Sequence, residues 1–252
     1  MPATPACTLT GEQEEGPYYV DGPKLRPDVT EGRPGVPPQL RIALLDAKKC
    51  NPLEGAAVDI WHCDAVGVYS ALTAMGSAGR GAPGANGPGR MGSNLRRGRG
   101  PDDFGGPWQL DETRFLRGVQ LTGPAGIVDF TTIYPGWYQG RTLHIHLKIH
   151  LGGSSRETYD GGHIAHTGQL FLPEEVTAEV ARMKPCETNS GVHRTLRNED
   201  MIFRSQHGSE GIVTLERLRP GSGADGFLAT ATLAVDPEAT PARVSAGRGQ
   251  GN

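Results

Sequence analysis

The strict alternation of residue types in the segment 143–151, LHIHLKIHL, restricts the fold more than any other feature of this chain. Side chains that alternate with a period of two are typical of a β-strand that buries one of its faces. The apolar members are Ile145, Leu147, Ile149 and Leu151, and the polar members are His144, His146, Lys148 and His150. We therefore predict a strand with an aliphatic side in the core and a second side that carries histidines.

Short strand-like segments recur along the chain, and residues that favour turns separate them. Besides 143–151, they are 39–46, 56–63, 115–121, 127–134, a strand that begins at 170, 212–215 and 227–234. One helix is predicted from Pro173 to about Met183, because proline suits the first helical position and two glutamates follow it. Many short strands with one short helix indicate an all-β protein, an antiparallel β-sandwich with long loops.

The predicted sandwich occupies residues 39–236, between an N-terminal arm, 1–38, and a flexible tail, 237–252. Within the sandwich, the segment 75–108 is dominated by glycine and contains five arginines. It lacks the apolar surface that it would need to fold by itself. Two interpretations stay open: a mobile lid whose arginines attract carboxylated or polyphenolic substrates, and a passive disordered loop.

Charge and hydropathy exclude some classes of partner. The net charge of −3 shows no basic excess, so nucleic acid is not an expected partner. No run approaches the ~18 consecutive apolar residues of a membrane span.

The four cysteines, Cys7, Cys50, Cys63 and Cys186, are compatible with two disulfides or with free thiols. The N-terminus lacks a secretory signal, yet the cysteines favour an exported mature chain, its leader removed, over a cytosolic protein. A monomer and a homo-oligomer are both compatible with the sequence.

His144 and His146 form the sharpest local motif. On a strand, residues two apart project from the same face, so their imidazoles form a ready pair of metal ligands. Tyr138 lies six residues before His144, beyond a Pro-Gly pair that favours a turn. A phenolate is a hard anionic donor, and phenolates with neutral imidazoles suit a hard trivalent ion better than zinc or copper(I). A polar strand face that merely contains histidines is the alternative.

Four segments in this order resemble the intradiol ring-cleavage dioxygenases, the family of catechol 1,2-, protocatechuate 3,4- and hydroxyquinol 1,2-dioxygenase. Residues 134–146, YPGWYQGRTLHIH, resemble the family's Pro-Gly-x-Tyr loop followed by Arg-x-x-His-x-His. The segment 58–70 resembles the strand that ends in Gly-x-Tyr, 16–19 resembles the Gly-Pro-Tyr segment at the substrate pocket, and 166–171 resembles a Thr-x-Gln-Leu-aromatic strand. The chain lacks the long N-terminal helical segment of catechol 1,2-dioxygenases, which places it nearer to the compact, single-domain branch.

The resemblance implies a mononuclear non-haem Fe(III) centre and a set of ligands for it. Tyr69 matches the tyrosine that stays on the iron, and Tyr138 matches the axial tyrosine that leaves when substrate binds. His144 and His146 match the two histidine ligands.

The resemblance also implies roles around the metal. Arg141 matches the arginine that stabilises the charge of the activated substrate, and Gln169 matches a polar residue beside that arginine. Gly16, Pro17 and Tyr18 match the segment that lines the substrate mouth.

The implied activity is cleavage of a catechol-type aromatic diol between its hydroxyl-bearing carbons. Both atoms of O2 enter a cis,cis-muconate-type product. Two alternatives stay open: a non-enzymatic β-sandwich that binds a ligand or a carbohydrate, and a zinc or copper enzyme that uses the His-x-His pair.

Four other histidines are interpreted as structural. His62 is expected in the core or behind the ligands, and His150 is expected too far along its strand to reach the metal. His163 and His166 are expected in a glycine-rich loop at the rim of the site.

Overall fold

The computed structural model describes residues 7–73, 110–218 and 226–245. The predicted inserted segment 75–108 lies outside the described residues, so its interpretation as a lid or a passive loop stays a prediction. The arm is described from Cys7 onward, and the predicted tail is described as far as residue 245.

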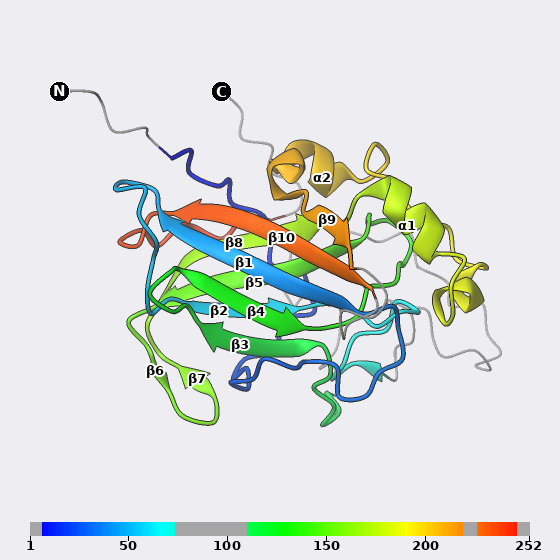
Figure 1. The fold of residues 1–252 in the computed structure, drawn as a ribbon, viewed down its shortest axis with the longest axis horizontal. Helices are drawn as coiled ribbons and strands as arrows, with labels where there is room; N and C mark the ends of the chain where they lie inside the picture. The colour runs from blue at the N-terminus through cyan, green and yellow to red at the C-terminus, as the bar shows by residue number, and fades with distance from the viewer. Residues whose placement is uncertain (1–6, 74–109, 219–225, 246–252) are drawn as a thin grey trace.

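Two four-stranded sheets pack face to face, and Figure 1 shows one in front of the other. The first sheet has the order β4 (Ile127–Thr131), β1 (Pro38–Asp46), β10 (Phe227–Val235) and β9 (Thr214–Arg217). The second sheet has the order β3 (Arg117–Leu121), β2 (Ala57–Trp61), β5 (His144–Leu151) and β8 (His163–Phe171). A small hairpin, β6 (Ser154–Ser155) with β7 (Tyr159–Asp160), extends from one end. The architecture is the predicted β-sandwich.

The alternation along β5 divides its side chains between two environments. Ile145, Leu147 and Ile149 belong to the main hydrophobic core between the sheets, together with Leu40 and Ile42 of β1. The burial of such aliphatic side chains is worth about 1.5–3 kcal/mol each relative to exposure, and it fixes which face of β5 turns inward. The histidines must therefore project from the outer face of the second sheet.

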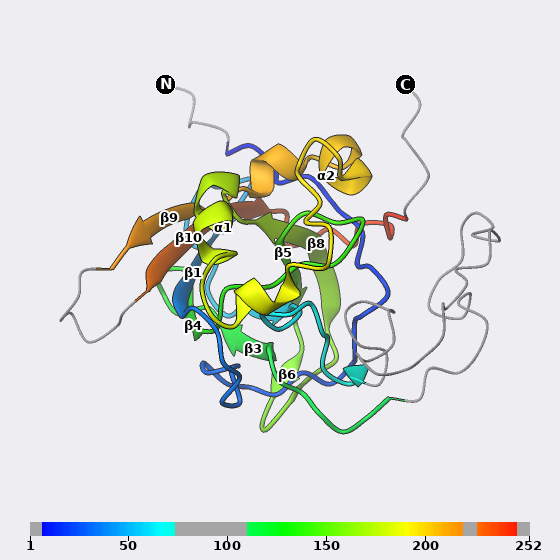
Figure 2. The ribbon, with the colours of Figure 1, turned by 90° about the vertical axis from the view of Figure 1, so that its right-hand side faces the viewer.

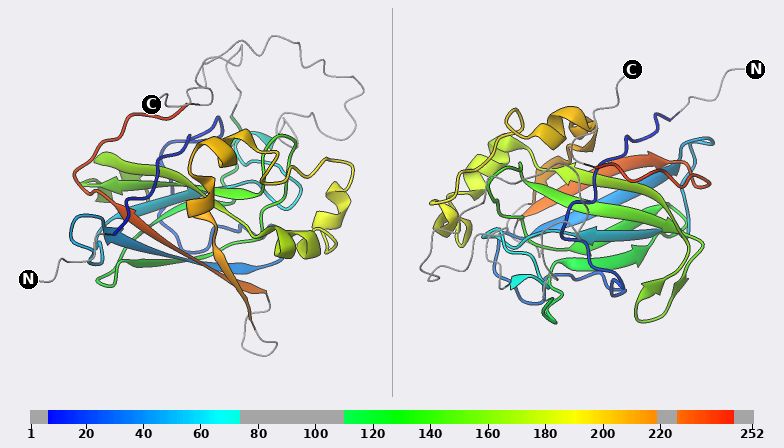
Figure 3. Two further views of the ribbon diagram at one scale, coloured as in Figure 1. Left: turned by 90° about the horizontal axis from the view of Figure 1, so that it is seen from above. Right: turned by 180° about the vertical axis from the view of Figure 1, so that it is seen from behind.

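That outer face does not meet solvent, because the N-terminal arm crosses it, as the right-hand view of Figure 3 shows. The Gln13 amide N–H donates to the Thr167 carbonyl of β8 at 2.9 Å. Farther along the arm, the Arg26 amide donates to the Val119 carbonyl of β3 at 3.0 Å. The second sheet is thus covered on both faces, which explains why all five residues of β2 are buried.

Two short α-helices lie at one end of the sandwich, which faces the viewer in Figure 2. The first, α1 (Glu174–Val180), corresponds to the predicted helix, but Pro173 is its N-cap and not its first residue. The second, α2 (Met201–Ser205), was not predicted. Single 3₁₀ turns span Cys186–Asn189 and Gly208–Gly211. None of the helices in the described part of the chain has the length and apolarity to cross a membrane.

Two strand features differ from the predictions. Strand β8 begins at His163 and not at residue 170, so His163 and His166 lie on a strand and not in a loop, and His166 is buried. The prediction failed because glycine and polar residues weaken the apolar alternation there. In addition, β1 pairs with β10 in parallel, whereas the other strand pairs among the described residues are antiparallel.

The cysteines divide into one bonded pair and two thiols. Cys7 and Cys50 form a disulfide that ties the start of the arm to the turn after β1. Cys63 and Cys186 are free and buried. The sequence alone could not choose between these arrangements, because the pairing depends on where the arm runs.

Candidate metal centre

Four polar side chains converge on the outer face of the second sheet. His144 and His146 project from β5, and their Nε2 atoms are 3.0 Å apart. The phenol oxygen of Tyr138, from the loop before β5, lies 3.2 Å from Nε2 of His144. The phenol oxygen of Tyr69, from the segment after β2, lies 3.5 Å from that of Tyr138. The structure thus brings together all four residues that the sequence predicted as ligands.

These separations suit donors that share one cation. Metal–nitrogen and metal–oxygen bonds are about 2 Å long, so adjacent donors on one ion lie about 3 Å apart. Among the described residues, no group of three or more His, Cys, Asp and Glu side chains could hold a metal. Any metal at this position must therefore use the phenols. Two hard phenolate oxygens and two imidazole nitrogens fit a trivalent iron ion well.

Burial sets the protonation of the two histidines. It lowers the pKa of both His144 and His146 well below the usual value, so both rings are neutral at neutral pH. Nδ1 of His144 lies 2.6 Å from the Thr142 carbonyl oxygen and donates to it. The proton therefore sits on Nδ1, and the Nε2 lone pair turns toward the other three donors. A backbone acceptor behind a ligand histidine is a common device for orienting the ring.

Burial shifts the pKa of the two phenols in the opposite direction, upward. It raises the pKa of Tyr69 well above the usual value, with the neighbouring phenol of Tyr138 adding to the effect. Burial likewise raises the pKa of Tyr138, while the charge of Arg141 works in the other direction. A cation among the four donors is the natural means of ionising two such phenols, since a bound ion reverses the local pKa shifts.

Aromatic rings fix the positions of the donors. The ring of Tyr18 stacks on that of Tyr69, with centroids 4.2 Å apart. The indole of Trp61 stacks on the imidazole of His146 at 4.9 Å and 5° between the ring planes. The ring of Tyr19 packs edge-on against Trp61. The arm therefore supplies part of the wall of the site.

Gly16 and Pro17 precede Tyr18 on the arm and are half-buried. Gly16 has a φ of +70°, and a Cβ there would lie 3.2 Å from Cε1 of His146. Only glycine adopts this backbone conformation without strain. These positions agree with the predicted place of the arm beside the metal, but a role in substrate binding stays a prediction.

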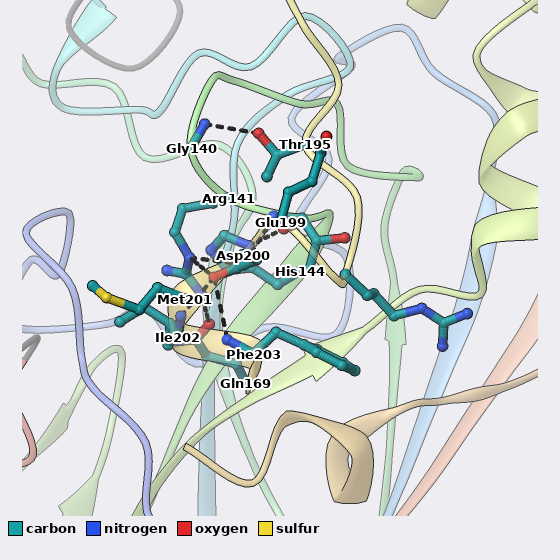
Figure 4. Close-up of polar contacts among 12 residues, drawn as sticks. Gly140, Arg141, His144, Gln169, Thr195, Glu199, Asp200, Met201, Ile202 and Phe203 are labelled. Atoms are coloured by element: carbon teal, nitrogen blue, oxygen red, sulfur yellow. Dashed lines mark hydrogen bonds and ion pairs between the residues drawn. The ribbon is translucent and has the colours of Figure 1, made fainter. Parts of the chain in front are cut away.

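Arg141 lies at the edge of the site in a network that Figure 4 shows. Its Nη2 group donates to Oε1 of Gln169, the residue predicted to accompany it. Its Nε group lies 3.2 and 3.0 Å from the two oxygens of Asp200. Nη1 is 3.6 Å from Oε1 of Glu14 on the arm. Asp200 was not predicted from the sequence, although an aspartate before Met-Ile-Phe is the signal of a helix N-cap.

The other histidines do not reach the four donors. His62 is fully buried, with Nδ1 2.7 Å from the Cys63 carbonyl oxygen and Nε2 2.7 Å from Oγ1 of Thr132. His150 lies 3.7 Å from Asp59. His166 lies 2.5 Å from Glu12 of the arm. His163 contacts the Pro237 carbonyl oxygen at 3.0 Å.

Similarity to known proteins appears at the level of structure. No model of a known protein family matches the chain, and no curated protein matches it by sequence. An intradiol ring-cleavage dioxygenase from Tetranychus urticae is similar, with a TM-score of 0.71 and 29% identity over 93% of this chain and 98% of that one. The dioxygenase domain of a carbohydrate-binding fusion protein from Streptomyces sp. SirexAA-E has a TM-score of 0.54 and 23% identity over 91% and 99%. Catechol 1,2-dioxygenase from Pseudomonas arvilla C-1 has a TM-score of 0.52 and 20% identity over 89% and 61%.

These matches confirm the predicted resemblance and the fold class. The chain has the fold of the intradiol ring-cleavage dioxygenases, including compact ones that it covers almost completely. They do not test the ligand roles of individual residues.

Proposed function

We propose that this chain, whose fold is that of the intradiol ring-cleavage dioxygenases, cleaves a catechol-type ring with O2 at a mononuclear iron(III) held by Tyr69, Tyr138, His144 and His146. The convergence of two phenol oxygens and two imidazole nitrogens within 3.0–3.5 Å of their neighbours carries the proposal. The similar dioxygenase from Tetranychus urticae, at 29% identity, supports it.

Iron(III), when bound, supplies Lewis acidity toward the two oxygens of the catechol. The chain supplies a base for the second phenol proton. Tyr138 is suited to this because it lies on a loop, and the positive charge of Arg141 favours its phenolate by lowering its pKa against the effect of burial. As a phenolate, Tyr138 would be one of the residues that hold the ion, and the same oxygen would be able to accept the second phenol proton of the substrate.

Arg141 supplies a fixed positive charge beside the reacting ring. Its side chain is only 14% exposed, and burial keeps water from screening the charge. A guanidinium that is already oriented stabilises negative charge that develops on the substrate without reorganising during the reaction. We infer that both atoms of O2 enter a cis,cis-muconate-type diacid. A small aromatic diol and O2 are then the only reactants required.

Metal and oxygen assays test the proposal directly. The purified, iron-loaded protein should be wine-red, because tyrosinate donates charge to iron(III), and it should contain one iron per chain. With a panel of catechol, protocatechuate, hydroxyquinol and larger catechols, at least one substrate should consume O2 and give a ring-opened diacid that carries both atoms of isotopically labelled dioxygen. A protein that stays colourless after iron loading would overturn the proposal.

Variants separate the binding of metal from catalysis. His144→Ala and His146→Ala should lose iron, whereas His193→Ala, which removes an exposed histidine that pairs with Glu199, should keep it. A His144→Ala protein with full iron content would contradict the assignment of the ligands.

A further inference from the structure

Asp200 is a carboxylate with no solvent exposure, and five contacts to its oxygens are made by backbone and arginine N–H groups. Oδ1 accepts from the amides of Ile202 and Phe203 at 2.8 and 3.2 Å and thereby caps the N-terminus of α2. Oδ2 accepts from the Thr142 amide at 2.9 Å and from Nε of Arg141 at 3.0 Å. A buried charge is tolerated only when it is paired and hydrogen-bonded in this way.

The contact with Nε determines how the guanidinium of Arg141 is oriented. Asp200 occupies the Nε edge, and Gln169 accepts from Nη2. Nη1 is 3.6 Å from the Glu14 carboxylate, which is beyond the distance of a good hydrogen bond. Two hydrogen-bond partners thus fix the plane of the guanidinium, and Nη1 faces the Glu14 carboxylate at the longer distance of an ion pair.

Asp200 also acts on the metal side of the same loop. The Thr142 amide donates to Asp200, while the Thr142 carbonyl accepts from Nδ1 of His144. The backbone of Thr142 therefore connects the buried carboxylate, through its N–H group, with Nδ1 of the proposed ligand His144, through its carbonyl group. Figure 4 shows Arg141, His144 and Asp200 gathered at the start of α2.

We propose that Asp200 is a positioning residue that holds Arg141 in its catalytic orientation. The inference rests on the proposed dioxygenase function, because it assigns the purpose of the arginine there. Asp200 itself does not touch substrate. It acts through a guanidinium whose direction it sets.

The test is Asp200→Asn in the iron-loaded protein. Asparagine caps a helix as well as aspartate does, so α2 keeps its N-cap. When its Oδ1 caps the helix, however, its NH2 group takes the place of Oδ2 and cannot accept from Nε of Arg141 or from the Thr142 amide. Since a displacement of about 1 Å can cost ~10²-fold in rate, we expect kcat per iron to fall about 10²-fold. Iron content should be retained, and a crystal structure of the variant should show a displaced guanidinium.

A matched control is Asp129→Asn. Asp129 of β4 receives Nε and Nη2 of Arg41 at 2.8 and 3.0 Å, the same kind of contact, but it is exposed and lies on the first sheet, whereas β5 with its two histidines belongs to the second sheet. It should leave kcat unchanged. If Asp200→Asn yields no folded protein, Asp200→Ser keeps the cap without placing an N–H group against the two donors.

A double-mutant cycle separates positioning from a general structural effect. If Asp200 acts through Arg141, the double variant Arg141→Met, Asp200→Asn should be no slower than Arg141→Met alone. Additive losses, or a kcat in Asp200→Asn within a few-fold of the parent, would overturn the positioning role. A parent protein that cleaves no catechol would instead refute the proposed function, and the position of Arg141 in the variant's crystal structure would still decide whether Asp200 orients it.

Discussion

At the scale of single residues, the two proposed tyrosine ligands have different surroundings. Tyr69 is 2% exposed, and the ring of Tyr18 stacks on its ring. Tyr138 is 8% exposed and lies on the loop between β4 and β5. The stacked ring of Tyr18 restricts the movement of Tyr69, whereas the Tyr18 ring meets that of Tyr138 only edge-on, with centroids 6.2 Å apart. The difference supports the proposal that Tyr138, and not Tyr69, accepts the proton of the substrate.

The first prediction compares Tyr138→Phe with Tyr69→Phe. Tyr138→Phe should retain iron through the three remaining donors but lose its base, so kcat should fall by about 10²–10⁴-fold. Tyr69→Phe removes the donor that we propose stays bound throughout, and it should lower both iron content and the visible charge-transfer absorption. Iron analysis and absorption spectra of both variants, beside oxygen uptake, provide the measurement. Parent-like turnover by Tyr138→Phe would contradict its role as the base.

The second prediction concerns His62 and acid. Burial lowers the pKa of His62 from 6.5 to about 4, so the folded state holds this histidine neutral. Because the folded-state pKa lies below the unfolded one, its stabilising contribution is full above pH 6.5 and is lost as the pH falls toward about 4. The loss amounts to about 3 kcal/mol, since each pKa unit is worth about 1.4 kcal/mol.

Denaturant unfolding of the iron-free protein across this pH range measures the effect. His62→Gln should be less stable than the parent at neutral pH, because its two buried contacts change, but its stability should decline less steeply toward pH 4. Parallel pH profiles for the two proteins would show that His62 is not the group responsible.

Three of the four proposed ligands could be predicted from a local motif, whereas Tyr69 was predicted only from the resemblance of the segment 58–70 to a known family. His144 and His146 occupy alternate positions of a strand, and Tyr138 lies close to them in the chain. Asp200 could not be assigned in this way, because it is 59 residues from Arg141 and only the packing of α2 brings the two together. A residue that acts through a side chain distant in the sequence is not marked by a local sequence motif.

At the scale of elements, the arm is as much a part of the site as the strands are. Its backbone adds hydrogen bonds to β8 and β3 at either end, and between them it places Gly16 against His146 and Tyr18 against Tyr69. Near α2, Oε1 of Gln206 accepts from the Glu14 amide at 2.8 Å. The short helix thus contacts Arg141 at its start and the arm at its end.

The third prediction uses two arm glycines with nearly the same backbone. Gly16 and Gly22 have φ values of +70° and +72°, but a Cβ at Gly22 would meet no atom within 4 Å, whereas one at Gly16 would press on the ring of His146. Both alanine variants should lose about 1 kcal/mol of stability from backbone strain. Only Gly16→Ala should also shift the iron charge-transfer band and lower activity. Equal spectra for the two variants would show that the arm does not restrain His146.

The strands were predictable where apolar alternation is strong, and the predictions failed where it is weak. Strand β5 begins within one residue of its predicted start, because four aliphatic residues mark its inner face. Strand β8 was missed over its first seven residues, 163–169, where its sequence reads HIAHTGQ. Its burial comes from the arm and from β5, so tertiary contacts decide its conformation.

At the scale of the whole molecule, a sandwich that buries both faces of one sheet depends on an arm that stays in place. The Cys7–Cys50 disulfide fastens the start of that arm and closes a loop over a sequence separation of 43 residues. By loop-closure entropy alone, such a bond is worth up to about 4 kcal/mol. A structural disulfide of this kind supports the proposal that the chain works in an oxidising compartment outside the cytosol.

The fourth prediction follows from the contrast between the bonded and the free cysteines. Burial raises the pKa of the Cys63 thiol, and also that of Cys186, so neither is a reactive thiolate in the folded protein. A thiol reagent should therefore find no reactive group in the native protein, two in denaturant, and four in denaturant after reduction, because one disulfide and two free thiols account for the cysteines.

Mild reduction should free only Cys7 and Cys50. It should release the arm before the sandwich unfolds, so catechol turnover should fall while the circular dichroism of the sheets persists. Retention of full turnover after reduction would show that contacts along β8 and β3 hold the arm without the disulfide.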